Sequence, residues 1–194
     1  MGLKIDRKKD NRVIRAFTHK LADIPGGVTV SAADLTQSAL LEGTPIGKGS
    51  NGLYHVVKCA KLTADAANDA TAYTVLKGHN FKVGAFVALK EGGKAYAITA
   101  IATNSSDATS DDITVGTTLG LAATAGDFLY EAAAQSATTT SALKYTPVAL
   151  VGESYDVDGG NLNVNAWTFA QIKEANIPPI GSVIKAKLAH ILFI

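Results

Sequence analysis

The chain contains few of the residues that build disulfide frameworks and metal sites. Its 194 residues include one cysteine, one tryptophan and one methionine, and aromatic side chains make up 7%. A single cysteine, Cys59, excludes an intramolecular disulfide and any metal site made from several cysteines. No uninterrupted apolar run approaches the ~20 residues that a membrane-spanning helix requires. We therefore expect neither a disulfide scaffold nor a membrane partner.

The chain also has little net charge, +1 at neutral pH, so its global charge does not indicate a nucleic-acid partner. The first twenty residues are nevertheless rich in basic side chains: Lys4, Arg7, Lys8, Lys9, Arg12, Arg15 and Lys20. This stretch has no apolar core of a secretion signal, so we expect synthesis and retention in a cytosol. A basic tail of this kind is either solvated or docked on an acidic partner, and the sequence leaves both interpretations open.

What the chain has in quantity is small apolar residues, threonine and 18 glycines. Hydrophobic residues make up 47%, enough to bury a core, and they lean towards alanine and valine. Such a composition favours short strands and tight turns over long helices. The predicted fold is therefore mainly β.

We expect three parts along the chain. Residues 1–35 are predicted to be a basic N-terminal arm, broken at Pro25-Gly26-Gly27. Residues 36–60 and 144–194 are predicted to form one β body. Residues 61–143 are predicted to be an insertion, with a small antiparallel β-barrel over residues 61–135 and a linker over 136–143. An SH3-like or related barrel suits the short strands and turns of this insertion.

The C-terminal part of the body has three recognisable patterns. Apolar residues alternate from 162 to 172, which favours a strand, although Thr168 and Gln171 could also form the capping box of a helix. Pro178-Pro179 is well placed to begin one short helix, because proline suits the first turn. The last residues are strongly apolar, and we expect them to be buried in a sheet or in an oligomer interface: Ile191, Leu192, Phe193 and Ile194.

No pattern of catalytic or ligand-binding residues is complete. Gly47-Lys48 would need Gly at 42 and Ser or Thr at 49 to form a phosphate loop, but the sequence has Glu42 and Gly49. The histidines occur singly, without ligand spacing: His19, His55, His79 and His190. We therefore predict that the chain is not an enzyme and holds no cofactor and no metal.

Asp156 and Asp158 have the acid spacing of a calcium loop. An EF-hand would place glycine at position 161 and a bidentate acid at 167, where this sequence has Asn161 and Trp167. A plain hairpin turn fits these residues better than a cation site.

Three stretches carry a resemblance to a known family. They are residues 43–54, with Gly43-Thr44-Pro45-Ile46-Gly47-Lys48, residues 145–151, and residues 163–177 together with 183–194. In these stretches the chain resembles the head fiber proteins of tailed bacteriophages and, more distantly, lambda-type head decoration proteins. The insertion at 61–135 departs from the compact decoration proteins.

The resemblance implies a structural virion protein with a β-tulip type body, located on the capsid exterior after synthesis in the bacterial host cytoplasm. Its partners would be the major capsid protein and further copies of itself, in a homotrimer. The basic arm would then dock on the capsid, and residues 191–194 would lie at a subunit interface. No nucleic-acid partner is implied.

A second hypothesis is a host-surface or carbohydrate-binding adhesion module displayed on the capsid. Glycan sites usually present exposed aromatic platforms, and the insertion offers only tyrosines for this purpose: Tyr73, Tyr96 and Tyr130.

Overall fold

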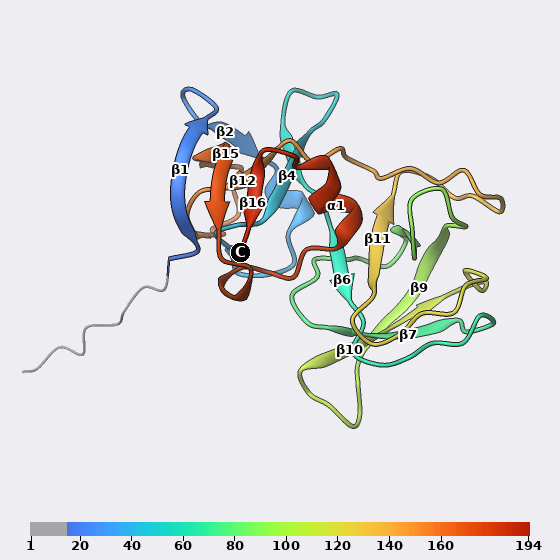
Figure 1. Ribbon diagram of the computed structural model, residues 1–194. Coiled ribbons are helices and arrows are strands. Elements are labelled where there is room, and N and C mark those ends of the chain that lie inside the picture. Colours follow the sequence, from blue (N-terminus) through green and yellow to red (C-terminus); the bar gives the residue numbers. More distant parts are fainter. Residues whose placement is uncertain (1–14) are drawn as a thin grey trace, which may run out of the picture.

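The computed structural model describes residues 15–194, and the protein is mainly β, with 41% strand and 7% helix (Figure 1). This confirms the mainly β prediction. The strands form an eight-stranded sheet, a six-stranded sheet and a two-stranded pair of β3 (Ala39–Leu40) with β13 (Tyr155–Asp156). Most strands have only a few residues, as expected from a chain rich in glycine and threonine.

The eight-stranded sheet draws on both ends of the described chain. Its order is β1-β15-β12-β4-β5-β2-β14, and β16 pairs with β15 beside that path. Its strands are β1 (Phe17–Asp23), β2 (Val28–Val30), β4 (Pro45–Lys48), β5 (Tyr54–Val56), β12 (Ala149–Val151), β14 (Leu162–Val164), β15 (Ala166–Ile172) and β16 (Ile191–Phe193). We call this sheet, with helix α1 (Ser182–Lys187) and the short 3-10 turns η1 (Ala32–Asp34) and η2 (Glu174–Asn176), the body.

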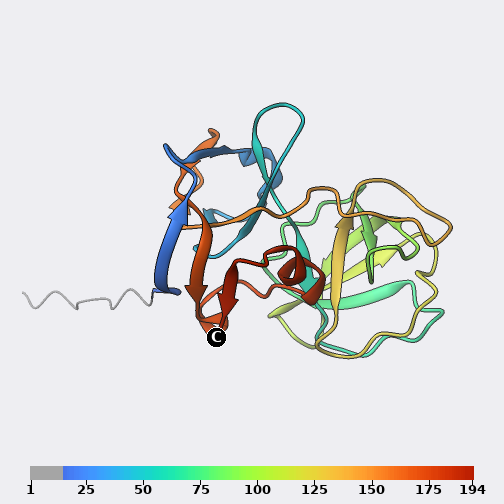
Figure 2. The same ribbon diagram turned by 45° about the horizontal axis from the view of Figure 1, so that its top comes forward.

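The six-stranded sheet curls into a half-barrel. Its order is β6-β11-β8-β9-β10-β7, and its strands are β6 (Cys59–Lys61), β7 (Ala72–Leu76), β8 (Phe86–Ala88), β9 (Tyr96–Thr103), β10 (Ser110–Val115) and β11 (Phe128–Ala132). A bridge between Leu62 and Val75 brings the two ends of this sheet together. We call residues 59–143, which contain this sheet, the insert; it lies beside the body in both ribbon views (Figure 1, Figure 2).

The three larger of four buried clusters in residues 15–194 stabilise the fold, and the fourth is a small alanine cluster in the insert. One fills the insert with residues such as Val75, Ile98 and Ile113, and a second fills the body with residues such as Val30 and Ile46. The third lies where α1 packs on the body sheet: Leu150, Ile172, Ile180, Ile184 and Leu188. This third cluster also includes Tyr130 of β11, so body and insert share a core.

The expected arm over residues 1–35 differs from the structure. From residue 17 onward the chain forms β1, which pairs with β15, and β2, which pairs with β14 and β5. Phe17, Val28 and Val30 are buried. The partner of β1, β15, and one partner of β2, β14, lie more than a hundred residues later, so no local pattern could reveal these pairings. Residues 1–14 of the expected arm lie outside the described residues.

Two segments with few large side chains are fixed within the insert: its first residues, and residues 136–143, which the sequence predicted to be a linker. Leu62 is buried, and Ala66 forms a β-bridge with Ala123. In the second segment, Ser136 bridges to Ala95 and the Ser141 carbonyl accepts a hydrogen bond from the Gly92 N–H at 2.7 Å. Backbone pairing therefore fixes these alanine- and threonine-rich stretches, although they carry few large side chains.

The structure confirms the predicted type of secondary structure for the C-terminal elements. Residues 166–172 form a strand, not the alternative helix, and α1 follows Pro178-Pro179. The apolar end forms β16, which pairs in parallel with β15. The expected burial of this strand holds only in part, because Ile191 is 6% exposed but Leu192 is 59% exposed and Ile194 is 52% exposed.

Candidate functional site

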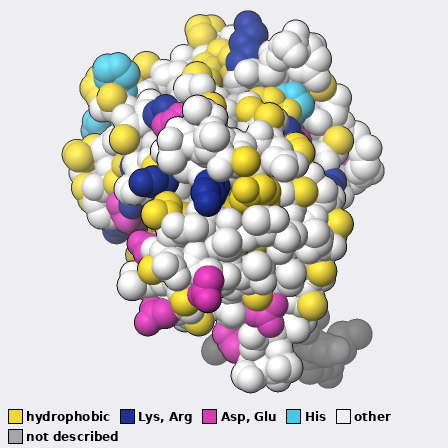
Figure 3. Space-filling view, turned by 90° about the vertical axis from the view of Figure 1, so that its right-hand side faces the viewer, with side chains coloured by type: hydrophobic (Ala, Val, Ile, Leu, Met, Phe, Trp, Pro, Cys, Tyr) yellow, Lys and Arg dark blue, Asp and Glu magenta, His cyan; other side chains and the backbone are white. Residues whose placement is uncertain are grey.

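Large exposed apolar side chains lie almost entirely on the body. Within residues 15–194 they are Leu21, Leu41, Val83, Val148, Phe169, Leu192 and Ile194, and all but Val83 belong to the body. The insert-side surface carries charged side chains of both signs among scattered apolar ones, with acidic residues gathered toward the lower end (Figure 3). Exposed apolar groups that cluster together mark contact surfaces. The body is therefore the part of the molecule that offers a candidate contact surface.

The register of β15 with its neighbours places several of these side chains on one face. Gln171 pairs with Leu192 of β16, and Phe169, two residues before Gln171, lies on the same side because side chains alternate along a strand. The ring of His190 contacts Phe169 edge to face, with 5.8 Å between centroids. Ile194 follows Leu192 with the same parity, and its N–H donates to the Ile172 carbonyl.

On the other side of β15, two residues of β1 extend this face. Ala22 pairs with Phe169, and His19 pairs with Gln171. We call the resulting set the outer face: His19, Ala22, Phe169, Gln171, His190, Leu192 and Ile194. Except for the half-buried Gln171, these residues are exposed. The outer face is a continuous sheet surface that spans three strands.

The opposite side of the same strands explains why the outer face stays exposed. Ala170, Ile172 and Ile191 point inward, where they pack in the cluster that contains Ile184 of α1. Strand alternation then forces Phe169 and Leu192 outward. The sequence around β16 is apolar at every position, so one half of it must face away from the core.

The two ends of the described chain meet at Ile172. This residue pairs with Phe17 of β1 on one side and with Phe193 of β16 on the other. Arg15, the first described residue, is exposed next to this point. The predicted basic segment and the predicted C-terminal interface therefore start from one edge of the body.

Of the seven predicted basic residues, the structure describes only Arg15 and Lys20. Lys4, Arg7, Lys8, Lys9 and Arg12 lie outside the described residues. Lys20 belongs to β1, where its ammonium donates to the Gly152 carbonyl at 3.3 Å and lies 5.1 Å from the ring centroids of both Phe17 and Trp167. These contacts hold the Lys20 ammonium against the body, so Lys20 does not extend from it as part of an arm.

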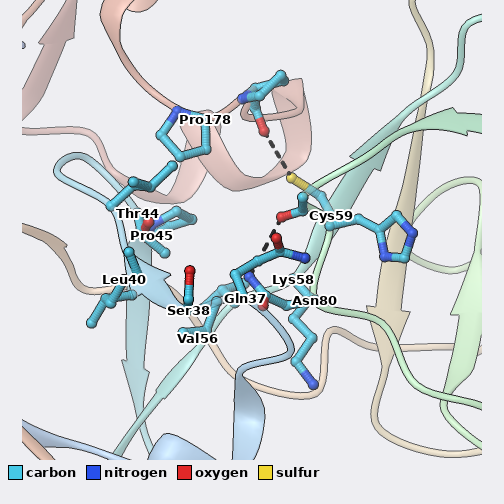
Figure 4. Close-up of a pocket in the computed structure, with 16 residues that line it drawn as sticks. Gln37, Ser38, Leu40, Thr44, Pro45, Val56, Lys58, Cys59, Asn80 and Pro178 are labelled. Atoms are coloured by element: carbon cyan, nitrogen blue, oxygen red, sulfur yellow. Dashed lines mark hydrogen bonds between the residues drawn. The ribbon is translucent and has the colours of Figure 1, made fainter. Parts of the chain in front are cut away.

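A cavity of about 260 Å³ lies between body and insert (Figure 4). Leu40, Pro45, Val56 and Pro178 line its body side, and Cys59 borders the insert. The Cys59 thiol donates to the Pro179 carbonyl at 3.4 Å, and burial raises its pKa to about 11. A thiol with so high a pKa stays protonated at neutral pH and is a poor nucleophile.

The connection between body and insert contains a buried ionic cluster. Glu131 Oε1 lies 3.0 Å from Lys144 Nζ and 3.6 Å from Lys58 Nζ. The side chains of Lys58 and Glu131 are 4% and 3% exposed, and burial lowers the pKa of Lys58. The second oxygen of Glu131 has no hydrogen-bond partner among the described residues. The cluster ties both connecting segments to β11.

The histidines of the interior are held by structural partners. His55 Nδ1 lies 2.6 Å from Asp34 Oδ2, and its ring stacks on Tyr145 at 4.3 Å. His79 Nδ1 accepts the Phe81 N–H at 3.0 Å, and burial lowers the pKa of His79. Neither histidine has a nucleophile within its hydrogen bonds, so neither forms part of a catalytic pair.

The remaining predicted ligand groups do not converge. Asp156 and Asp158 are both exposed beside a turn at Gly159, but the predicted hairpin does not form, because β13 before the turn pairs with β3 and β14 after it pairs with β2. No group of three or more His, Cys, Asp or Glu residues in the described part of the chain has a metal-binding arrangement. Across residues 15–194, no helix has the length and apolar character needed to cross a membrane.

The tyrosines of the insert form no exposed platform. Tyr73 is 1% exposed and Tyr130 is 4% exposed, and the Tyr73 hydroxyl donates to the Ala70 carbonyl. Tyr96 is half-buried. A stacking surface for a sugar ring needs an open aromatic face, so these residues do not support the carbohydrate-binding hypothesis.

Of the outer face, the sequence indicated only Leu192 and Ile194. Phe169 and Gln171 lie in the alternating stretch 162–172, which was the signal for their common side, whereas no local pattern indicated His19, Ala22 or His190. No family model matches the chain, and comparisons with curated proteins and with solved structures found no match either.

Proposed function

We propose that this protein is a structural component of a virion, a capsid decoration or head fiber protein that binds the outer capsid surface of a tailed phage and stabilises it as a homotrimer. The observation that carries the proposal is the contrast between the two parts of the molecule. The body has six of the seven large exposed apolar side chains of residues 15–194, whereas the insert has only Val83. Such a molecule attaches through its body and presents its insert to solvent.

The resemblance supports the same assignment. The stretches similar to head fiber proteins all lie in the body: residues 43–54, 145–151, and 163–177 together with 183–194. Under this proposal the body sheet is the decoration-type β-tulip fold, and the insert is an addition to it. The major capsid protein and further copies of the chain are then its partners.

The position of the basic segment fits a capsid partner. Residues 1–14 hold Lys4, Arg7, Lys8, Lys9 and Arg12 against Asp6 and Asp10, and they join the body beside Phe17. A basic segment is attracted to an acidic surface, and this attraction weakens as salt screens the charges. In this proposal the segment supplies the electrostatic part of capsid attachment.

Co-sedimentation with expanded capsids tests the proposal. The intact chain should pellet with capsids and saturate, and a chain that lacks residues 2–14 should bind at least tenfold more weakly. This deletion ends before β1, whereas removal of residues 1–35 would destroy β1 and β2 and would test folding instead. A matched control is the variant Lys90→Glu/Lys94→Glu, which changes charge on the insert only.

Three outcomes are distinguishable. Saturable binding that weakens with the deletion and at about 0.5 M salt, where the Debye length is below ~8 Å, supports the proposal. Equal binding by the deleted chain would show that the basic segment does not contribute to capsid binding. Failure of the intact chain to bind capsids of the phage that encodes it would overturn the proposal.

A further inference from the structure

One loop of the insert is bonded directly to the body. Asn80 Oδ1 accepts the Thr36 N–H at 2.9 Å and the Thr36 hydroxyl at 3.3 Å. Asn80 has a φ of 57° and is the one non-glycine residue with positive φ in residues 15–194, and Gly78 has a φ of 90°. Residues 78–80 also border the cavity between body and insert, where Asn80 lies beside Gln37 (Figure 4). We call residues 78–80 the latch.

The imidazole of His79 fixes the conformation of the latch. Its Nδ1 accepts the Phe81 N–H at 3.0 Å, and this bond encloses Asn80. The ring also packs on Phe81, with 5.3 Å between centroids, and Phe81 is buried in the core of the insert. A ring nitrogen that accepts a hydrogen bond carries no proton, so the single proton of the neutral ring is on Nε2. His79 therefore holds the latch only in its neutral form.

We propose that protonation of His79 opens the latch, so that the loop leaves the body and the cavity beside it widens. The imidazolium has an N–H at both ring nitrogens. Its Nδ1–H then faces the Phe81 N–H, and the bond that encloses Asn80 cannot form. Asn80 in turn loses the position from which it accepts the Thr36 N–H. The inference does not depend on the proposed capsid function, and it adds a response of the molecule to acid.

On the insert side, Asp111 of β10 is the charged group that faces the ring. Its Oδ2 lies 3.5 Å from His79 Nε2, and its Oδ1 lies 3.7 Å from the Lys77 ammonium. Asp111 favours the imidazolium in the closed latch, and Lys77 shares that carboxylate. His79 Nε2 nevertheless has no hydrogen-bond partner among the described residues, so Asp111 compensates a charge on the ring only in part.

On the body side, the nearest charge is the buried Lys58, which disfavours a second positive charge on His79. The other charged groups at this junction have partners of their own: Asp34 is bonded to His55, Glu131 pairs with Lys58 and Lys144, and Lys82 donates to the Ala33 carbonyl.

The sign of the response follows from burial. The His79 side chain is 7% exposed, and this burial lowers the pKa of His79 below its ordinary value of 6.5, although Asp111 acts in the opposite direction. In the open loop the ring regains its ordinary pKa, so the open state binds the proton more tightly than the closed one. The latch is therefore closed above pH 6.5 and opens as the pH falls below that value.

Amide hydrogen exchange on the full chain, resolved by NMR between pH 7.5 and 5.0, tests the proposal. After correction for the intrinsic exchange rate, the protection of the Phe81 and Thr36 amides should be constant above pH 6.5. Below it, protection should fall by up to about tenfold for each pH unit, because one pKa unit is a factor of ten in the opening equilibrium. The Val151 amide, which donates to the Thr44 carbonyl at 3.0 Å in the body sheet, should keep its protection.

Three variants separate the steps of the mechanism. His79→Gln has no ring to protonate, so the protection of Phe81 should not change below pH 6.5. Asn80→Gly keeps the positive φ but removes Oδ1, so Thr36 should lose protection already at pH 7.5 while Phe81 keeps its pH dependence. In Asp111→Asn the decline should extend to lower pH, because the closed imidazolium loses its counter-charge. Fluorescence of anilinonaphthalene sulfonate, a dye that binds exposed apolar surface, should rise below pH 6.5 for wild type but not for His79→Gln.

Each result decides the proposal. Constant protection of Phe81 and Thr36 in the wild-type chain would overturn it, and so would an unchanged decline in folded His79→Gln. A parallel loss at Val151 would show general unfolding in place of a latch. If His79→Gln fails to fold, Asp111→Asn gives the decision, since a decline that does not extend to lower pH would remove His79 as the group that titrates. Lost protection without dye binding would overturn the widening of the cavity.

Discussion

Glu131 bonds to Lys144 twice, once through its side chain and once through its backbone. Its Oε1 accepts from Lys144 Nζ at 3.0 Å, and its carbonyl accepts the Lys144 N–H at 3.1 Å. On the other side, the Glu131 N–H donates to the Lys58 carbonyl, also at 3.1 Å. A single residue of β11 is thus bonded to both segments that connect the body with the insert.

The first prediction follows from this arrangement. Glu131→Ala removes the carboxylate that pairs with the buried Lys58, and an uncompensated buried charge costs about 3–5 kcal/mol. The free energy of unfolding, measured by urea titration, should fall by that amount. Glu174→Ala is the control, because Glu174 pairs with Lys185 at 2.7 Å but is 47% exposed. An exposed pair of this kind contributes at most about 1 kcal/mol.

Replacement of both buried charges sharpens this prediction. The double variant Lys58→Met/Glu131→Leu removes the charges together, so it should be more stable than Glu131→Ala. If the double variant were the less stable of the two, the buried ion pair itself would be the stabilising element.

The second prediction concerns acid stability. Burial lowers the pKa of His79 from its ordinary value of 6.5, so between that value and the folded pKa the unfolded chain binds more protons than the folded one. The stabilising contribution of neutral His79 is therefore complete above pH 6.5 and is lost as the pH falls below it. Urea midpoints measured from pH 7.5 to 4.5 should decline less steeply for His79→Gln than for wild type.

Gln135→Ala is the control for this experiment, because Gln135 is an exposed side chain of the insert without an ionisable group. Its stability should follow the wild-type pH profile. Parallel profiles for wild type and His79→Gln would show that His79 is not part of the acid sensitivity.

The third prediction concerns the Cys59 thiol. Because its pKa is about 11 in the folded chain against 9.0 for an ordinary thiol, the folded state keeps the proton longer. Its stabilising contribution is complete below pH 9 and is lost as the pH rises from 9 towards 11. At pH 8, a thiol reagent such as dithionitrobenzoate should react at least a hundredfold more slowly with native than with urea-unfolded protein. Equal rates would contradict the half-buried, hydrogen-bonded position of the Cys59 thiol.

The fourth prediction tests the close packing of α1 against the insert. A Cβ at position 181 would overlap the ring and hydroxyl of Tyr130. Gly181→Ala should therefore lower the free energy of unfolding by about 1–3 kcal/mol, the usual cost of overpacking. Gly160→Ala, where a Cβ would meet no atom within 4 Å, should change stability by less than ~0.5 kcal/mol. Similar losses for both variants would contradict the packing.

Local patterns predicted most of the strands but not how they associate. The alternation over residues 162–172 and the prolines before α1 correctly indicated a strand and a helix, because both signals lie within a few residues. The pairing of Phe17 with Ile172 spans most of the described chain, so the basic composition around β1 outweighed its two or three apolar residues. Long-range pairing is decided by the whole sheet, and a local window does not contain it.

The candidate surface was predictable to the same extent. Residues 191–194 stood out because four consecutive apolar residues end the sequence. Sequence alone could not tell that Ile191 points into the core while Leu192 points out, since that depends on the register with β15. Phe169 and His190 join the surface only through this register, which explains why they were missed.

The position of Glu131 between the two connecting segments also has a consequence for the architecture of related chains. Entry and exit of the insert are bonded to one residue of one strand, and the insert side chains in the shared core lie on that strand or at the two connections: Tyr130, Phe128, Cys59 and Leu143. One loop of the insert also bonds to the body, because Asn80 accepts the Thr36 N–H and Lys82 donates to the Ala33 carbonyl. The insert is therefore anchored at its root and at this one loop, and its more distant loops are where a change of sequence would disturb the body least.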